Sequence, residues 1–423
     1  MIIMYNAKIK IFVLLFAFWQ QACVNTDLQN GEHSSTNGAV VSQNSPETKE
    51  ANTPELTLQV GAEQLQDYLP MLRGKRLGLV VNQTSTIGKT HLVDTLLLYQ
   101  MDIKAVFAPE HGFRGDADAG EKVANGRDPQ TGIPIISLYG KHKEPTAEDL
   151  KNIDLLIFDI QDVGARFYTY ISTLHYVLQA GAKHNVPILV LDRPNPNGHY
   201  VDGPILDPNF QSFVGMHPVP VVHGMTVGEY AQMIIGENWL DNALQPKLTV
   251  IRCTNYTHQT SYDLPVAPSP NLPNMRSIYL YPSLCFFEGT VFSVGRGTNT
   301  QFQIYGHPDF NIGSYKFTPR SGPGAKYPKL ENETCNGISL ERLTPAAIRA
   351  EGQLNLFYLL QAYTHYPDKK NFFLSNHFID KLAGSSRLRE QVTAGWTAEQ
   401  IRASWQDDLE TFNQVRAKYL LYE

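Results

Sequence analysis

The chain has few basic residues and few cysteines. It contains 35 lysines and arginines against 41 aspartates and glutamates, a formal net charge of −6, so the composition does not favour a nucleic-acid partner. Of its four cysteines, those beyond Cys23 show no paired spacing, which argues against a zinc framework and against a disulfide-dense scaffold. We therefore expect Cys253, Cys285 and Cys335 to be small buried side chains.

The motifs of several common enzyme classes are also missing. The sequence has no phosphate-binding loop, no H-E-x-x-H zinc motif and no G-x-S-x-G nucleophile motif. Gly295-x-Gly297 is not a nucleotide fingerprint, because it lacks the third glycine and does not join a first strand to a helix. These absences argue against nucleotide-binding, zinc-protease, serine-hydrolase and phosphate-ester hydrolase chemistry. We expect neither a metal nor a cofactor.

The overall composition fits a folded enzyme of ordinary size. Of 423 residues, 42% are hydrophobic and 18% charged, which excludes an intrinsically disordered chain. At roughly 150 residues per domain, the length allows about two to three domains. The 26 prolines, 31 glycines, 20 phenylalanines and 21 tyrosines indicate many shaped loops and ring-lined surfaces. Such surfaces are typical of carbohydrate-handling and other extracytoplasmic enzymes.

The amino-terminal segment carries targeting signals. Residues 1–23 join a short positive region to an apolar run that is too short to span a membrane permanently, as in a signal peptide. The run ends in a sequence that resembles a bacterial lipobox at Cys23, although Gln20 departs from the usual aliphatic residue; an ordinary signal peptide is the alternative. Residues 24–55 are polar and predict a flexible tether. We expect an exported periplasmic or cell-envelope lipoprotein that contacts the membrane only through this lipid anchor.

Residues 56–264 alternate between strand and helix signals. Continuous β-branched runs separated by helical patterns are typical of a parallel sheet with crossover helices on both faces. We therefore predict an α/β fold with a Rossmann-like, doubly wound parallel sheet. The expected strands are 77–81, 103–108, 154–160, 186–191 and 248–251, and the expected helices are 91–100, 168–184 and 226–239.

Residues 265–423 have a different character. A proline-rich linker is followed by short aromatic segments and then by helical patterns, which predict a second, smaller α+β domain that completes a cleft with the first. The expected strands are 278–281, 291–294 and 302–305, and the expected helices are 353–366 and 398–419.

Polar side chains follow four of the predicted parallel strands. Ligands bind beyond the carboxyl ends of such strands, where loops and helix starts converge. Any one of these side chains can instead be structural, since a strand end often needs a polar residue to cap the next helix. Together they form the pattern of a site; they are Asn82, Glu110 with His111, Asp159 with Gln161 and Asp162, and Asp192 with Arg193.

Glu110 and His111 lie in the most concentrated of these loops. A glutamate beside a histidine, in a glycine-flanked loop that lets a ligand approach closely, can act as a general acid tuned by its neighbours. The structural alternative is an ion pair between Glu110 and an arginine, which would hold the loop.

The remaining candidates suit a sugar ligand. Carboxylates such as Asp162 can bind hydroxyl groups, Arg166 can clamp a carboxylate, and the Tyr168 ring can stack on a pyranose face. Asp162 can instead cap a helix start. In the turn 192–198, around Asn195, we expect polar side chains that point outward; the alternative is a proline-stiffened connection with an internal Asp–Arg pair. His223 can face the same crevice or be structural. The second domain adds Glu288, Arg296 and Thr298 in glycine-flexible loops.

At these residues the sequence resembles the exo-β-N-acetylmuramidase family of NamZ-like glycoside hydrolases. The resemblance runs from about residue 56 to the carboxy terminus, and the motifs that carry it are 82–85, 108–115, 158–166, 191–196, 287–290 and 295–298. It implies a Rossmann-like domain and a smaller carboxy-terminal domain with the active site between them. It also implies release of N-acetylmuramic acid from the non-reducing end of peptidoglycan fragments, muropeptides or disaccharides. The catalytic carboxyl group would be Glu110, with His111 beside it.

The mechanism that follows has alternatives for two roles. Glu110 would protonate the glycosidic oxygen, and Asp162, Glu288 or the substrate's own acetamido group would be the second participant. Arg166, Arg296 or Arg114 would bind the lactyl carboxylate of muramic acid. The competing function is a non-catalytic, lipid-anchored protein that binds muropeptides or sugars in the same crevice.

Overall fold

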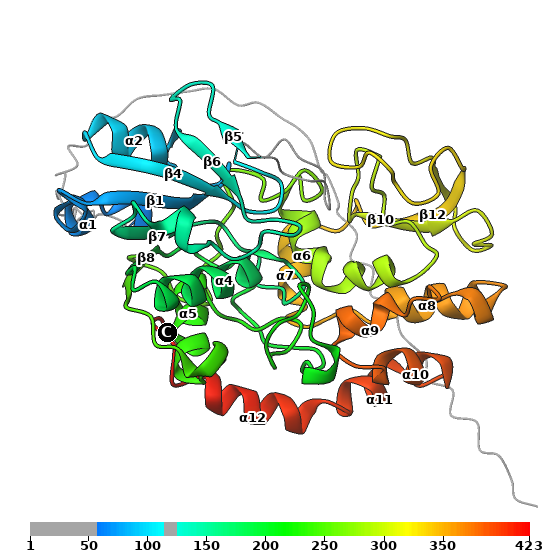
Figure 1. The fold of residues 1–423 in the computed structure, drawn as a ribbon. Coiled ribbons are helices and arrows are strands. Elements are labelled where there is room, and N and C mark those ends of the chain that lie inside the picture. The colour runs from blue at the N-terminus through cyan, green and yellow to red at the C-terminus, as the bar shows by residue number, and fades with distance from the viewer. Residues whose placement is uncertain (1–56, 114–124) are drawn as a thin grey trace, which may run out of the picture. The chain divides into compact units, whose positions relative to one another are not determined.

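A seven-stranded sheet forms the centre of the first part of the chain in the computed structural model (Figure 1), which describes residues 57–113 and 125–423. The strands are β1 (Arg76–Val81), β4 (Asp102–Ala108), β5 (Gly126–Arg127), β6 (Pro134–Ser137), β7 (Leu155–Asp159), β8 (Ile188–Leu191) and β9 (Leu248–Ile251). The predicted signal segment, Cys23, the tether and Arg114 lie outside the described residues.

The strand order confirms the predicted doubly wound sheet. The order is β5-β6-β4-β1-β7-β8-β9, and all neighbouring pairs are parallel except β5 with β6. Without the antiparallel edge strand β5, this is the Rossmann order, in which the chain reverses direction across the sheet beside its first strand. All five predicted strands are present. Strands β5 and β6 were not predicted; both are short, β5 is exposed and β6 is only partly buried.

Helices cover both faces of this sheet (Figure 1). Alternate residues of β1 show why: Leu77, Leu79 and Val81 pack in the hydrophobic cluster of α1 and α2, whereas Val80 packs in the cluster of α4 and α5. The helices are α1 (Leu65–Leu72), α2 (Leu92–Leu98), α3 (Ala147–Leu150), α4 (Tyr170–Lys183) and α5 (Val227–Gly236). A hairpin of β2 (Thr86–Ile87) and β3 (Thr90–His91) precedes α2.

The second part of the chain combines helices with a three-stranded antiparallel sheet in the order β10-β12-β11. Its strands are β10 (Ile304–His307), β11 (Tyr315–Phe317) and β12 (Cys335–Ser339). Its helices are α6 (Met275–Leu284), α7 (Pro345–Ala350), α8 (Phe357–His365), α9 (Phe378–Ala383), α10 (Arg387–Thr393), α11 (Ala398–Ala403) and α12 (Gln406–Arg416). The α+β prediction is confirmed, and the described residues belong to one compact unit.

Three predicted elements of this part were wrong. Residues 278–281 are inside α6, where Asn274 caps the helix start by accepting from the Ser277 N–H, and every residue from 277 to 284 is buried. A short apolar run that is buried all round has no periodicity that separates strand from helix. Residues 291–294 form only a bridge between Ser293 and Gly306. The predicted helix 398–419 is two helices, α11 and α12, with Trp405 at φ −121° between them.

The three cysteines beyond the amino-terminal segment are buried, as the sequence predicts, and they form no disulfide. Among the residues that the structure describes, no helix combines the length and the hydrophobicity needed to cross a membrane.

Candidate active site

A cavity of about 820 Å³, including its open mouth, lies where the carboxyl ends of β4 and β6 meet the start of α4. We call this cavity the pocket. Residues that follow β4 and β6 or precede α4 contribute to its lining, together with side chains of α6, α9 and the loops between them. Ligands of open α/β sheets bind at this edge. Five of the predicted site residues line the pocket, namely Glu110, His111, Tyr168, Glu288 and Arg296.

Glu110 follows the buried end of β4 and is only partly buried itself. The Thr169 hydroxyl donates a hydrogen bond of 2.6 Å to Glu110 Oε2. The Tyr139 hydroxyl also interacts with Glu110: burial, and then the charge and hydrogen bond of Glu110, raise the pKa of Tyr139 above its ordinary value. Two hydroxyl groups from different loops therefore hold one carboxyl group at the pocket.

A sharp turn after Glu110 positions the buried His111. The Gly112 N–H donates to the Pro109 carbonyl at 3.0 Å, and His111 and Gly112 both have left-handed backbone angles, with φ of 70° and 78°. A non-glycine residue in this conformation is uncommon and is found preferentially at functional sites.

An ion pair between Glu288 and Arg296 forms the second charged part of the lining. Arg296 Nε lies 2.8 Å from Glu288 Oε1, and both side chains are 24% exposed. Lys329 lies nearby and donates its ammonium to the carbonyls of Phe287 and Thr290. Burial alone would raise the pKa of Glu288, but the charges of Arg296 and Lys329 lower it overall. One carboxylate is thus surrounded by two cations, which leaves a surplus of positive charge.

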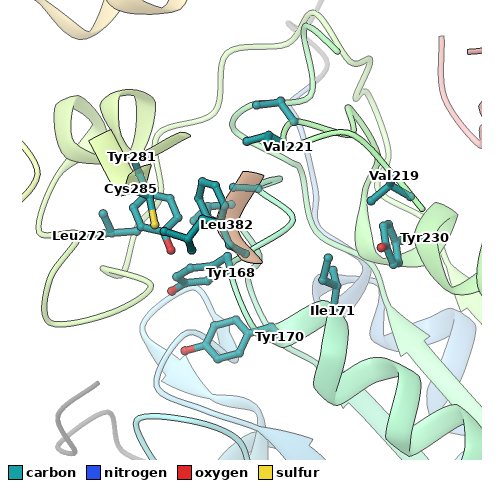
Figure 2. Packing of buried hydrophobic residues seen from close by; sticks show 14 of the residues in the cluster. Tyr168, Tyr170, Ile171, Val219, Val221, Tyr230, Leu272, Tyr281, Cys285 and Leu382 are labelled. Atoms are coloured by element: carbon teal, nitrogen blue, oxygen red, sulfur yellow. The ribbon is translucent and has the colours of Figure 1, made fainter. Parts of the chain in front are cut away.

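Aromatic rings supply much of the remaining lining (Figure 2). Tyr168 and Tyr170 meet edge to face with ring centroids 4.9 Å apart, and both hydroxyls donate to the Pro268 carbonyl, at 2.9 and 3.1 Å. Tyr281 of α6 lies against Tyr168 with ring centroids 5.8 Å apart. The Arg296 guanidinium lies 5.0 Å from the centre of the Phe302 ring. Aromatic lining with a few convergent polar groups is typical of small-molecule sites.

Asp159 and Arg193 do not line the pocket but pair with each other. Arg193 Nε and Nη2 donate to the two Asp159 oxygens at 2.6 and 3.0 Å, and both side chains are almost fully buried. The expectation that polar side chains of the 192–198 turn point outward was wrong, because Asp192, Arg193 and Asn195 are all buried. The Arg193–Asp159 pair joins the ends of β7 and β8 instead.

Three predicted amides also bond within the loops. Asn82 Oδ1 accepts from the Thr84 N–H at 2.9 Å, and the Thr84 hydroxyl oxygen accepts from the Gln161 N–H at 3.0 Å. Gln161 Nε2 donates to the Pro194 carbonyl at 2.7 Å. Asn195 Oδ1 accepts from the backbone N–H two residues further on, at 2.9 Å. These amides connect the strand-end loops to one another.

Asp192 is bound from several elements. Its oxygens accept from the hydroxyls of Thr226 and Tyr422, both at 2.7 Å, and from the Gly228 N–H at 2.8 Å. Burial raises its pKa to about 6, against the effect of these donors. His223 is also buried, and burial lowers its pKa to about 3. Neither side chain is part of the pocket lining.

Arg166 is fully buried and bonds only to backbone carbonyls. It donates to Pro204 at 2.8 Å, to Val219 at 2.6 Å and to Leu382 of α9 at 2.8 Å, and burial lowers its pKa to about 9. Leu382 lines the pocket but Arg166 does not. The guanidinium therefore ties the loop before α4 to a helix of the second part.

Asp162 is buried behind the pocket lining. Its Oδ2 accepts from the Gly164 N–H at 2.6 Å, and its Oδ1 has no hydrogen-bond partner among the described residues. Burial raises its pKa to about 7. It is not the cap of α4, since Thr169 occupies that position. Thr298 stabilises its own turn by donating to the Gly295 carbonyl at 2.6 Å.

Tyr139 and Thr169, the two residues that hold Glu110, were not predicted from the sequence. Tyr139 follows β6, a strand that was not predicted, so nothing marked it as a strand-end residue. Thr169 lies beside the predicted Tyr168. Its position directly before a long helix was the one feature of the sequence that could have indicated it.

Within the part of the chain that the structure describes, no three His, Cys, Asp or Glu side chains cluster in a way that could hold a metal ion. The acidic and basic side chains of the pocket lining are two glutamates, a histidine and an arginine. Such a set can transfer protons and bind an anionic substituent without a bound ion.

Comparisons with known proteins agree with this architecture. The family model described as the N-terminal part of exo-β-N-acetylmuramidase NamZ matches residues 77–276, and the model of its C-terminal part matches residues 279–422. The two models thus meet inside α6, whereas the sequence analysis predicted a boundary at 264. A curated relative, peptidoglycan β-N-acetylmuramidase NamZ of Bacillus subtilis (strain 168), is 38% identical over 397 residues, covering 89% of this chain and 94% of that protein.

Two crystal structures of DUF1343 family proteins from Bacteroides fragilis NCTC 9343 have similar folds. One is 47% identical with a TM-score of 0.81 and covers 87% of this chain and 99% of that chain. The other is 28% identical with a TM-score of 0.73 and covers 88% of this chain and 100% of that chain. The matching models, the curated relative and the shared fold together show that the chain belongs to the exo-β-N-acetylmuramidase NamZ family.

Proposed function

We propose that the chain is an exo-acting glycoside hydrolase that releases N-acetylmuramic acid from the non-reducing end of peptidoglycan fragments. The observation that carries this proposal is the position of Glu110, a partly exposed carboxyl group held by Thr169 at a ring-lined pocket. The curated relative, 38% identical over most of the chain, is a peptidoglycan β-N-acetylmuramidase.

Glu110 is the proposed general acid. Glycosidases ordinarily protonate the leaving-group oxygen with one carboxyl group and use a second group to stabilise or attack the sugar carbon. Glu288 is a candidate for the second role, because it lines the pocket and its neighbouring cations keep it ionised. The acetamido group of the substrate is the other candidate. Asp162 supports the loop before α4 in this proposal, since it does not line the pocket.

Arg296 is the proposed partner of the lactyl carboxylate that distinguishes muramic acid from glucosamine. It lines the pocket, and Lys329 supplies a second positive charge beside Glu288, so an added carboxylate meets a favourable potential. Arg166 does not serve this role, because it does not line the pocket and its two terminal nitrogens donate to backbone carbonyls. The rings of Tyr168 and Tyr281 supply apolar surface for a pyranose ring.

We also propose that the mature protein is a cell-envelope lipoprotein attached through Cys23. The support is the apolar run that ends in an alanine and a cysteine, followed by a polar segment. Incorporation of a labelled fatty acid into the full chain, with Cys23→Ala as control, tests this location. Equal labelling of both chains would contradict it.

The decisive experiment uses a disaccharide of N-acetylmuramic acid linked to N-acetylglucosamine, and the inverse disaccharide. Mass spectrometry is expected to detect released N-acetylmuramic acid from the first substrate only, with Glu110→Gln reducing the rate by roughly 10²- to 10⁴-fold. Glu288→Gln and Asp162→Asn, compared in the same assay, separate the candidates for the second group. Saturable binding without release would favour the non-catalytic sugar- or muropeptide-binding function.

A further inference from the structure

The hydroxyl of Thr169 does not cap the helix that it precedes. Thr169 is the N-cap residue of α4, yet its side chain makes no hydrogen bond to the first turn of that helix. Among the residues that the structure describes, four other helices begin after a threonine, and in each the hydroxyl accepts a backbone N–H three residues on; these residues are Thr146, Thr226, Thr344 and Thr397. Capping is the usual use of threonine at this position. Thr169 therefore departs from a pattern that the same chain follows elsewhere.

The backbone of Thr169 explains this departure. The four capping threonines have extended backbone angles, which direct the hydroxyl toward the helix start. Thr169 already has helical angles, with φ −76° and ψ −4°. Its hydroxyl instead donates to Glu110 Oε2 at 2.6 Å, across 59 residues of sequence. The bond joins the loop after β4 to the start of α4, which is the longest helix of the described sheet region at 14 residues.

We propose that Thr169 is a positioning residue that orients the Glu110 carboxyl group for proton transfer. This inference rests on the proposed function of Glu110. In this proposal the acidic proton is carried by Oε1, the oxygen that Thr169 does not bond, while Oε2 accepts from the Thr169 hydroxyl. In the reaction the Oε1–H bond breaks and the proton joins the glycosidic oxygen. The resulting carboxylate keeps the Thr169 donor, which stabilises the new negative charge.

Tyr139 supports this arrangement from the other loop. Its hydroxyl interacts with the same carboxyl group, and its ring packs edge to face on Phe213 with centroids 6.0 Å apart. Tyr139 and Thr169 both line the pocket, so both hydroxyls lie where the substrate binds in the proposed function. Thr169 is the better target for a test, because threonine and valine have nearly the same shape.

The test compares kcat, KM and the pH profile of the full chain with those of Thr169→Val and Thr169→Ser on a chromogenic muramide. Thr169→Val is expected to lower kcat roughly 10- to 100-fold, with a smaller change in KM, because the carboxyl group loses its fixed orientation. The limb of the profile that Glu110 titrates moves to higher pH, because the ionised form loses a donor. Thr169→Ser restores both properties. Thr169→Ala, which also lacks the hydroxyl, gives the same shift and serves if the valine variant does not fold.

Thr344→Val is the matched control. Thr344 caps α7 by accepting from the Ala347 N–H at 3.1 Å, far in the sequence from every residue of the pocket lining. This variant is expected to lower Tm while kcat and the pH profile stay unchanged. Thr169→Val is expected to change the pH profile with a smaller loss of Tm.

The outcomes separate this inference from the proposed function. Normal kcat and an unshifted profile in Thr169→Val would overturn the role of Thr169 while leaving Glu110 in place. Equal loss in the serine and valine variants, with no shift of the profile, would reduce Thr169 to a structural residue and overturn the inference as well. A fully active Glu110→Gln would instead remove the proposed function on which the inference rests.

Discussion

Two groups of polar side chains lie at the carboxyl edge of the same sheet, and they differ in what they bond to. Asp159, Asp192 and Arg193, which we call the strand-end framework, are buried and bond to one another's loops or to neighbouring helices. Glu110 after β4 is partly exposed and is held by Thr169 at the pocket. The comparison shows that a polar strand end indicates a site only when its side chain retains access to a cavity.

Breaking the framework is expected to have the largest effect on stability. Asp159→Asn leaves the Arg193 guanidinium buried without its charged partner and should lower the free energy of unfolding by about 3–5 kcal/mol. Chemical denaturation followed by circular dichroism measures this loss. Asp154→Asn is the control, since its pair with Arg76 has side chains 37% and 41% exposed and should contribute much less. Equal losses in the two variants would remove the distinction between buried framework and surface pair.

Breaking the charged part of the pocket should change activity more than stability. Arg296→Gln removes the proposed partner of the lactyl carboxylate, and kcat/KM for a muramic acid substrate should fall roughly 10- to 100-fold. The unmodified chain should prefer the free acid over its methyl ester, and the variant should lose this preference. Steady-state kinetics on both substrates checks it. A variant that still prefers the free acid would assign the carboxylate to another residue.

The same comparison explains which strands and which site residues could be predicted from the sequence. Continuous apolar runs such as 77–81 and 186–191 predicted the central strands correctly, because burial on both faces leaves a clear pattern. Glu110, Tyr168, Glu288 and Arg296 were predicted and do line the pocket. Arg193 was predicted in the same way but is buried in the framework. The sequence shows the type of a residue and whether it follows a strand. The burial of its side chain depends on loops from distant segments that pack over the site, such as the loop that contains Pro268.

Asp162 is buried, unlike Glu110, but is not bonded into the framework. The pH dependence of stability tests its contribution. Its folded pKa of about 7 is above the ordinary value of 3.8, so the folded chain holds the proton more tightly than the unfolded chain. This contribution stabilises fully below the ordinary pKa and is lost as pH rises through about 7. Asp162→Asn should therefore reduce the loss of stability between about pH 5 and pH 8 by about 2–3 kcal/mol. Denaturation across this range measures it.

The activity of the same variant decides the placement of Asp162. If Asp162 only supports the loop before α4, Asp162→Asn should retain most of kcat, in contrast to Glu110→Gln. A loss of activity as large as that of Glu110→Gln, with unchanged stability, would return Asp162 to the catalytic residues and extend the pocket to the end of β7.

The smallest expected effect comes from a substitution in the carboxy-terminal tail. It tests whether the framework stays stable when one donor to Asp192 is lost. Tyr422 donates to Asp192 Oδ2 at 2.7 Å and accepts from the Cys253 N–H at 2.9 Å, so it joins the chain end to β8 and to the loop after β9. Tyr422→Phe removes both bonds but leaves Asp192 the donors of Thr226 and Gly228. The free energy of unfolding should fall by about 1 kcal/mol, with kcat unchanged. A larger loss would mean that the remaining donors do not compensate, whereas reduced kcat at unchanged stability would connect the framework to the pocket and weaken the distinction between them.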